Sequence, residues 1–379
     1  MGIQVIGWPQ KLKNVMNDIF DSSFIAGEKP VYIIAELGSN HNGSIELAKE
    51  HIEVAFNSGC TAIKFQLPFA NEAYPPKTKF GDLYGDVYID ELIRKNEIGI
   101  DFLNVMNDYA HNLGLETGCS GDGFIALEMM QKLKFDFYKI PSFTISHLPL
   151  LKEMDQLGVP VILSTGRHTL GQIDEAVRSL PNNLKGILHC ISAYPCPEDQ
   201  LNLSTIPFLK QAFAQTIGFS DHSLDATRAP GLAVALGAKI IEKHFTLDRT
   251  LSGPDHFFAL QPDELKAMVD EIRKIENDSN YAVQVLHSPG NEILLGNPKN
   301  GLVQAEEAFY TRTRLGIYFT ESLPAGSILN KKNLQVFRCA DTEPVLHPRY
   351  LELLIGSKLV KNVEAFTPST WEDVIQYVN

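Results

Sequence analysis

The hydrophobic positions from residue 31 onward fall into two alternating patterns. Short runs rich in β-branched residues, typical of buried strands, alternate with longer segments that have the hydrophobic spacing of an amphipathic helix. Strand candidates are found at 31–37, 61–66, 115–119, 135–140, 160–164, 186–192, 216–219 and 239–243. Helix candidates include 45–57, 124–132, 170–179, 232–236 and 262–275. This alternation predicts parallel strands joined by crossover helices.

The number of strand–helix units narrows the fold class. Eight units in about 250 residues match the size of a closed (β/α)8 barrel, the TIM barrel. An open, doubly wound sheet is the alternative. Its phosphate-binding turn would require the spacing GxGxxG after the first strand, whereas residues 38–43 read GSNHNG. We therefore predict an α/β fold built on a closed barrel.

The pattern changes after about residue 277. Turn dipeptides such as Pro289-Gly290 and Asn300-Gly301 predict a linker over 278–310. The alternating segment 334–337 and the turn at 324–326 then favour a small β-rich module over 311–379. The predicted organisation is an N-terminal extension (1–29), a catalytic barrel (30–277), the linker and this module.

Composition and charge exclude several classes of protein. The 379 residues carry 33 Lys and Arg against 46 Asp and Glu, a net charge of −13, and 44% of them are hydrophobic. Without a visible basic patch, we expect no binding to nucleic acid or to an anionic membrane. The five cysteines form no CxxC pair, which argues against a disulfide framework and a structural zinc site. With Lys11 and Lys13 in the first twenty residues and no apolar run of about 18, we expect a cytoplasmic protein.

Polar side chains follow nearly every predicted strand. In a barrel of this kind, the reacting groups project from the carboxyl ends of the strands. In strand order, the residues at these ends are Glu36; Lys64 and Gln66; Ser120; Lys139 and Ser142; Ser164 and Thr165; Ser192 and Tyr194; Ser220, Asp221 and His222; and Glu242, Lys243 and His244.

Two histidines suggest a metal centre. His222 and His244 follow neighbouring strands, so their rings can meet over the barrel mouth. Two imidazoles with a carboxylate, here Glu36 or Asp255, are a usual way to hold a catalytic divalent ion. The alternative is that each histidine is a hydrogen-bonded wall residue.

Lysines and hydroxyls at the strand ends suggest an anion site. Lys64 and Lys139 would stand beside the hydroxyls of Ser142, Ser164, Ser192 and Ser220. Such a set can hold a phosphate dianion, which a net-negative chain would not otherwise attract. In a different class of reaction, one of these lysines, desolvated in the mouth, would form a Schiff base with a carbonyl substrate. The simplest alternative is surface lysines and turn serines.

Several segments together resemble the sialic acid synthase family, which makes N-acetylneuraminate, legionaminate and pseudaminate. Residues 34–43 (IAELGSNHNG) are similar to the opening signature of this family. Further similar segments, in the family's order and spacing, are 62–66 (AIKFQ), 138–142 (YKIPS), 163–166 (LSTG), 219–223 (FSDHS), 241–248 (IEKHFTLD) and 253–256 (GPDH). The resemblance covers about residues 30–275. The C-terminal module more loosely resembles the family's antifreeze-like (SAF) domain.

The resemblance implies condensation of phosphoenolpyruvate with an open-chain N-acylated hexosamine, which releases phosphate. It implies that Glu36 handles protons or orients water, and that His222 and His244 bind Mn²⁺ or Mg²⁺. It also implies contacts from Glu242, Tyr194 and Asp255 to the sugar or to metal-bound water. The residues implied to hold phosphoenolpyruvate, with Gln66 beside them at a strand end, are Lys64, Ser120, Lys139, Ser142, Ser164, Ser192 and Ser220.

The chain also departs from the family pattern. Residues 119–122 read CSGD where relatives usually have STPF, Ser192 replaces a common Asn, and Arg338 precedes Cys-Ala instead of Pro-Gly. The resemblance implies a homodimer in which the antifreeze-like domain caps the neighbouring barrel and Arg338 reaches the partner's sugar. These departures leave open a barrel that binds a sugar acid without catalysis. They also leave the identity of the hexosamine open.

Overall fold

The computed structural model describes residues 30–80, 86–339 and 344–375. The predicted N-terminal extension (1–29) therefore lies outside the described residues. Eight parallel strands close into one barrel in sequence order, and β8 pairs with β1. They are β1 (Tyr32–Gly38), β2 (Ala62–Leu67), β3 (Glu116–Gly121), β4 (Phe137–Ile140), β5 (Val161–Ser164), β6 (Leu184–Cys190), β7 (Ile217–Asp221) and β8 (Ile240–His244). The prediction of a closed (β/α)8 barrel is confirmed.

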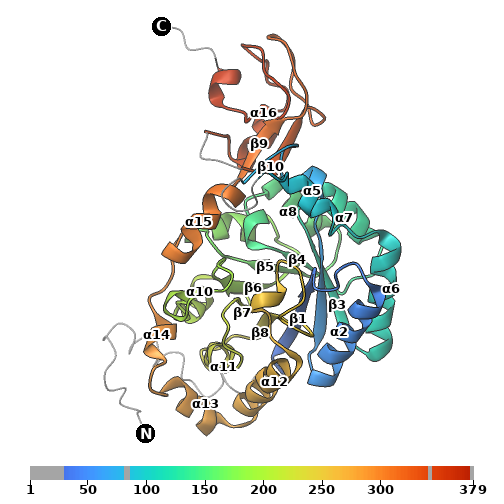
Figure 1. The fold of residues 1–379 in the computed structure, drawn as a ribbon. Helices are drawn as coiled ribbons and strands as arrows, with labels where there is room; N and C mark the ends of the chain where they lie inside the picture. The colour runs from blue at the N-terminus through green and yellow to red at the C-terminus, as the bar shows by residue number, and fades with distance from the viewer. Residues whose placement is uncertain (1–29, 81–85, 340–343, 376–379) are drawn as a thin grey trace.

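Helices surround the barrel (Figure 1). They are α2 (Ile45–Ser58), α6 (Ile100–Leu113), α7 (Phe124–Gln131), α8 (Leu148–Gln156), α9 (Leu170–Arg178), α10 (Thr205–Ala212), α11 (Arg228–Ala235) and α12 (Pro262–Asn277). The long connection after β2 also contains α3 (Ala70–Ala73) and α5 (Ile89–Arg94). Short 3₁₀ helices lie at Ser142–Thr144, Glu198–Gln200 and His256–Phe258. The sixth strand ends two residues before its predicted end, so Ser192 lies in the loop that follows it.

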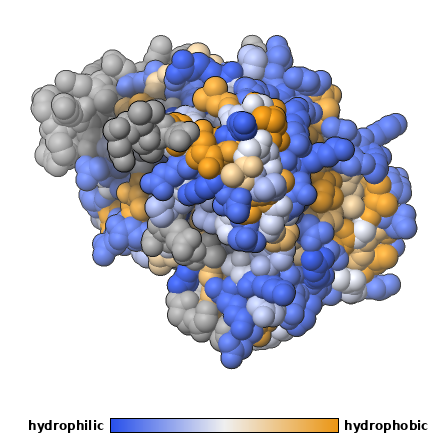
Figure 2. Space-filling view, turned by 90° about the horizontal axis from the view of Figure 1, so that it is seen from above, coloured by the Kyte–Doolittle hydropathy of each residue, from blue (hydrophilic) through white to orange (hydrophobic). Residues whose placement is uncertain are grey.

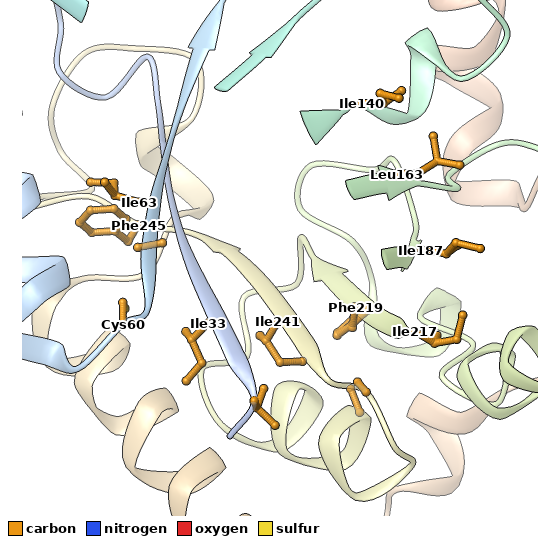
Figure 3. Close-up of a cluster of buried hydrophobic side chains, with 14 of the residues drawn as sticks. Ile33, Cys60, Ile63, Ile140, Leu163, Ile187, Ile217, Phe219, Ile241 and Phe245 are labelled. Atoms are coloured by element: carbon orange, nitrogen blue, oxygen red, sulfur yellow. The ribbon is translucent and has the colours of Figure 1, made fainter. Parts of the chain in front are cut away.

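The strands bury both faces, as expected of a parallel barrel. Outward-facing residues such as Ile33, Ile241 and Phe219 pack between the strands and the helices (Figure 3). Inside the barrel, a smaller cluster that includes Ile34 and Leu188 separates the polar mouth from the other end. Packing in both clusters stabilises the strand register. The register in turn determines where along the barrel axis the polar residues of the mouth lie.

The segment predicted as a linker contains helices that pack on the barrel. They are α13 (Ser279–Leu286), α14 (Glu292–Leu295) and α15 (Gln304–Thr313). The N–H of Leu203 donates a hydrogen bond of 2.9 Å to the carbonyl of Leu294, which attaches α14 to the loop after β6. The turn dipeptides separate these helices. They do not produce an extended tether, because hydrophobic residues such as Leu286 and Leu294 are buried in the barrel core.

The C-terminal module is a small, sheet-containing unit that lies over one end of the barrel (Figure 1). It contains β9 (Leu315–Phe319), which pairs antiparallel with β10 (Leu334–Arg338), and the short helix α16 (Leu351–Leu354). Further 3₁₀ turns lie at Pro348–Tyr350 and Trp371–Asp373. The module has its own hydrophobic cluster, which includes Ile317 and Leu359. Its Gln335 side chain donates a 2.7 Å hydrogen bond to the carbonyl of Asn71 in α3.

The surface agrees with the acidic, polar composition. The face seen from above is mostly hydrophilic, with hydrophobic residues in scattered patches (Figure 2). Over the residues that the structure describes, none of the helices has the length and apolar content needed to cross a membrane.

Candidate active site at the barrel mouth

A cavity of about 210 Å³ opens at the carboxyl ends of the strands. All but three of the predicted site residues line it, together with Leu67, Asp122, Phe143 and Cys190. The lining residues that the sequence predicted are Lys64, Gln66, Ser120, Lys139, Ser142, Ser164, Tyr194, Ser220, His222, Glu242, His244 and Arg338. Strand register explains this convergence, because Glu36 of β1 stands opposite both Lys64 of β2 and His244 of β8.

Glu36, one of the three exceptions, lies behind the lining and contacts it. Its Oε2 lies 2.5 Å from Lys64 Nζ, and its Oε1 accepts a 2.7 Å hydrogen bond from Gln66 Nε2. Burial raises the pKa of Glu36, although Lys64 opposes the shift. Burial lowers the pKa of Lys64, but Glu36 and Glu242 outweigh it and the net shift is upward. A buried carboxyl whose pKa is raised is a suitable proton donor or acceptor.

Glu242 stands between the two predicted anion-binding lysines. Its Oε1 lies 3.3 Å from Lys139 Nζ and accepts a 2.8 Å hydrogen bond from Ser220, and its Oε2 lies 3.9 Å from Lys64 Nζ. Burial would raise the pKa of Glu242, but the two ammonium groups lower it to about 2. Burial lowers the pKa of Lys139 despite this carboxylate. The mouth therefore holds two lysine side chains, Lys64 and Lys139, whose positive charge is partly balanced by the carboxyl groups of Glu36 and Glu242.

The two histidine rings meet as predicted. The ring centroids of His222 and His244 are 5.5 Å apart, and Tyr194 packs 4.3 Å from His222. His222 Nδ1 donates a 2.9 Å hydrogen bond to the carbonyl of Ile191, which leaves Nε2 as an acceptor toward the cavity side. The second exception, Asp255, lies next to His244, with Oδ2 3.6 Å from Nδ1. Burial raises the pKa of Asp255 to about 6.

Several buried polar atoms in the mouth suit a bound polar ligand. His244 Nδ1, Glu242 Oε2 and Ser164 Oγ are buried and accept or donate no hydrogen bond within the described residues. Such orphaned atoms are rare in folded proteins unless a ligand, ion or water satisfies them. Over residues 30–80, 86–339 and 344–375, no group of three His, Cys, Asp or Glu side chains is arranged as a complete metal site. His222 and His244 are the two imidazoles that meet here, and the divalent cation expected on them stays a prediction.

The hydroxyl groups gather around Gly166. A Cβ at this position would lie 2.2 Å from Ser192 Oγ and 2.8 Å from Ser142 Oγ, so a larger residue would displace both. The third exception, Ser192, is thus packed behind the lining. Sequence reasoning missed Cys190, whose Sγ accepts a 3.4 Å hydrogen bond from Ser142 Oγ and lies 3.8 Å from His222 Nδ1. The sequence signal that could have identified Cys190 is its position near the carboxyl end of the sixth strand.

Arg338 reaches the mouth from β10 of the same chain. Its Nη2 lies 2.5 Å from Asp122 Oδ2, and its guanidinium stands 3.7 Å from the ring centroid of Phe143. These contacts lie within one chain, and the expectation that this arginine serves a partner's barrel stays a prediction. Asp122 belongs to the segment that departs from the family pattern, and the structure shows what the departure does: its carboxylate pairs with Arg338.

Two polar residues at strand ends point away from the mouth. Lys243 Nζ lies 2.6 Å from Asp221 Oδ2 and donates a 2.7 Å hydrogen bond to the carbonyl of Ser223. The alternation of side chains along β7 and β8 places this pair outside the barrel, while Ser220, Glu242 and His244 face in. The pair ties the loop that carries His222 to β8.

The fold and the site together define the class of protein. A closed (β/α)8 barrel whose mouth collects two lysines, four acidic groups and a histidine pair is a candidate enzyme. A model of the NeuB family matches residues 51–283. The chain belongs to this family, the family of the sialic acid synthases.

Individual relatives agree with this assignment. The spore coat polysaccharide biosynthesis protein SpsE of Bacillus subtilis is 38% identical over 93% of this chain and 95% of its own. Its crystal structure superposes with a TM-score of 0.82 over 93% of this chain and 97% of that chain. The N,N'-diacetyllegionaminic acid synthase of Campylobacter jejuni is 37% identical over 65% of this chain and 77% of its own. The N-acetylneuraminic acid synthetase of Leptospira borgpetersenii, in a complex with citrate, has a TM-score of 0.60, 31% identity and coverages of 75% and 91%.

Proposed function

We propose that this chain is a nonulosonic acid synthase that condenses phosphoenolpyruvate with an open-chain N-acylated hexosamine and releases phosphate. The observation that carries the proposal is the placement of Lys64 and Lys139 with Ser142, Ser164 and Ser220 in one cavity. Two ammonium groups and several hydroxyls suit the phosphate and carboxylate of phosphoenolpyruvate. Relatives named as synthases of sialic-type acids support the reaction class.

The reaction forms one carbon–carbon bond and breaks one carbon–oxygen bond. Carbon 3 of phosphoenolpyruvate attacks the sugar aldehyde, whose oxygen takes up a proton. Water adds at carbon 2 and loses a proton, and the tetrahedral intermediate expels phosphate. Glu36, buried and held by Lys64 and Gln66, would accept or deliver a proton at these oxygens. Lys139 and Lys64 stabilise the negative charge of the phosphate as it leaves.

His222 and His244 are the residues that would hold a divalent cation, Mn²⁺ or Mg²⁺. A cation there would act as a Lewis acid that polarises the aldehyde. Asp255 beside His244, and Tyr194 against both rings, would then contact the sugar. Arg338, which also lines the cavity, would contact the far end of the sugar.

The test measures phosphate release from phosphoenolpyruvate across a panel of N-acyl and di-N-acyl hexosamines. We expect release only when an N-acylhexosamine and a divalent cation are both present. The variant Glu36→Gln, which keeps the hydrogen bond with Gln66 but cannot transfer the proton, should bind phosphoenolpyruvate with little turnover. Binding by the wild type without phosphate release from any sugar would favour a non-catalytic sugar-acid-binding protein.

One observation keeps a second reaction class in view. Burial lowers the pKa of Lys139, which favours the neutral amine that a Schiff-base aldolase requires. This alternative predicts inactivation by borohydride in the presence of a carbonyl substrate, blocked in Lys139→Arg, and activity that is indifferent to chelators.

The predicted homodimer is a separate proposal. A monomeric mass by light scattering, with full activity, would contradict it.

A further inference from the structure

Glu306 is a fully buried carboxylate outside the predicted barrel. It lies in the first turn of α15, in the segment that joins the barrel to the C-terminal module, and its exposed fraction is 0%. Lys299 Nζ lies 2.9 Å from Glu306 Oε2, and both side chains are at least 96% buried. A buried charge persists only when it is paired and hydrogen-bonded, so this carboxylate has a defined task in the fold.

One oxygen of Glu306 joins two loops of the barrel mouth. Its Oε1 accepts a 2.9 Å hydrogen bond from the N–H of Arg167, which follows β5, and a 2.8 Å hydrogen bond from the N–H of Ser192, which follows β6. Hydrogen bonds from backbone amides to a carboxylate are among the stronger ones. The bond to Arg167 also fixes a strained backbone, because that residue has φ +66° without being glycine.

The two loops carry hydroxyl groups of the proposed phosphoenolpyruvate site. Ser164 is the last residue of β5, and the N–H of Gly166 donates a 3.0 Å hydrogen bond to Ser142 Oγ. Ser192 Oγ packs against Gly166 from the other loop. Through Arg167 and Ser192, Glu306 therefore joins the two loops around which the side chains of Ser142, Ser164 and Ser192 gather.

We infer that Glu306 is a positioning residue for the phosphoenolpyruvate end of the active site, and that α15 is part of the catalytic unit. The inference rests on the proposed function and deepens it. Without the carboxylate, the β5 and β6 loops lose their shared acceptor, and Arg167 is free to leave its strained conformation. The hydroxyls around Gly166 would then separate, although none of the residues that touch substrate has changed.

The experiment compares four proteins by steady-state phosphate release. The main variant is Glu306→Leu combined with Lys299→Met, which removes the pair without leaving a buried charge. Glu306→Gln with Lys299→Met restores the acceptor oxygen without the charge. The matched control is Glu307→Gln, because Glu307 is the exposed neighbour on the same helix. Hydrogen exchange at the amides of residues 167 and 192 reports the loop contacts directly.

We expect the main variant to raise the KM for phosphoenolpyruvate by about tenfold or more, with a smaller change in the KM for the sugar. The variant Glu306→Gln with Lys299→Met should bring the KM for phosphoenolpyruvate most of the way back to the wild-type value. The control Glu307→Gln should match the wild type. Faster exchange at both amides with an unchanged KM for phosphoenolpyruvate would show a merely structural role and overturn the inference. If the wild type itself releases no phosphate, the proposed function fails and this inference fails with it.

Discussion

The ion pair between Asp122 and Arg338 makes a quantitative prediction about how the C-terminal module docks. The pair joins the end of β3 to β10, and its side chains are only 12% and 16% exposed. Removing one partner of a well-buried pair costs about 3–5 kcal/mol, and an exposed pair contributes at most about 1 kcal/mol. For this pair we expect a coupling energy of about 1–3 kcal/mol between Asp122→Asn and Arg338→Gln.

The assay is a double-mutant cycle on the free energy of unfolding in urea, repeated over a range of protein concentrations. The control cycle uses Lys152 and Glu352, which also bridge the barrel and the module but are 50% and 64% exposed. There we expect a coupling energy of at most about 0.5 kcal/mol. A coupling for Asp122 and Arg338 that is equally small, or that disappears on dilution, would refute docking of the module on its own barrel. The second outcome would favour the cross-dimer arrangement that the family resemblance implies.

Three further predictions concern the site and its surroundings. Lys139→Met should raise the KM for phosphoenolpyruvate by about a hundredfold in the phosphate-release assay, since a buried ammonium is lost; unchanged kinetics would exclude it from the anion site. Removal of divalent cations with a chelator should abolish activity, which added Mn²⁺ restores in the wild type but not in His222→Ala with His244→Ala; full activity in the chelator would exclude the cation. Burial raises the pKa of Glu72 to about 7, so the folded state binds more protons than the unfolded state between about pH 4.5 and 7. Stability should therefore fall by up to about 3 kcal/mol as pH rises through that window, and Glu72→Gln should lose this dependence in urea unfolding; an identical pH profile in the variant would contradict the shift.

The sequence by itself determined the barrel and most of the mouth. Strand and helix patterns differ in period, so their alternation identifies the β/α units, and the carboxyl ends of parallel strands must meet at one end of a barrel. That rule is sufficient to predict that Lys64, Lys139, Glu242 and the two histidines lie together at the mouth.

Contacts between segments far apart in the chain were decided only by the tertiary structure. The turn dipeptides of 278–310 predicted a linker. The local pattern does not show that α15 brings Glu306 into contact with the β5 and β6 loops. In the sequence, Asp122 is only a departure from a family motif, and the folded structure pairs it with Arg338, 216 residues later. Likewise, the ion pair between Lys243 and Asp221 depends on the pairing of β7 with β8, which brings the two side chains together outside the barrel. Periodicity is a property of neighbouring residues, whereas ion pairing and hydrogen bonding depend on which distant surfaces the folded chain brings into contact.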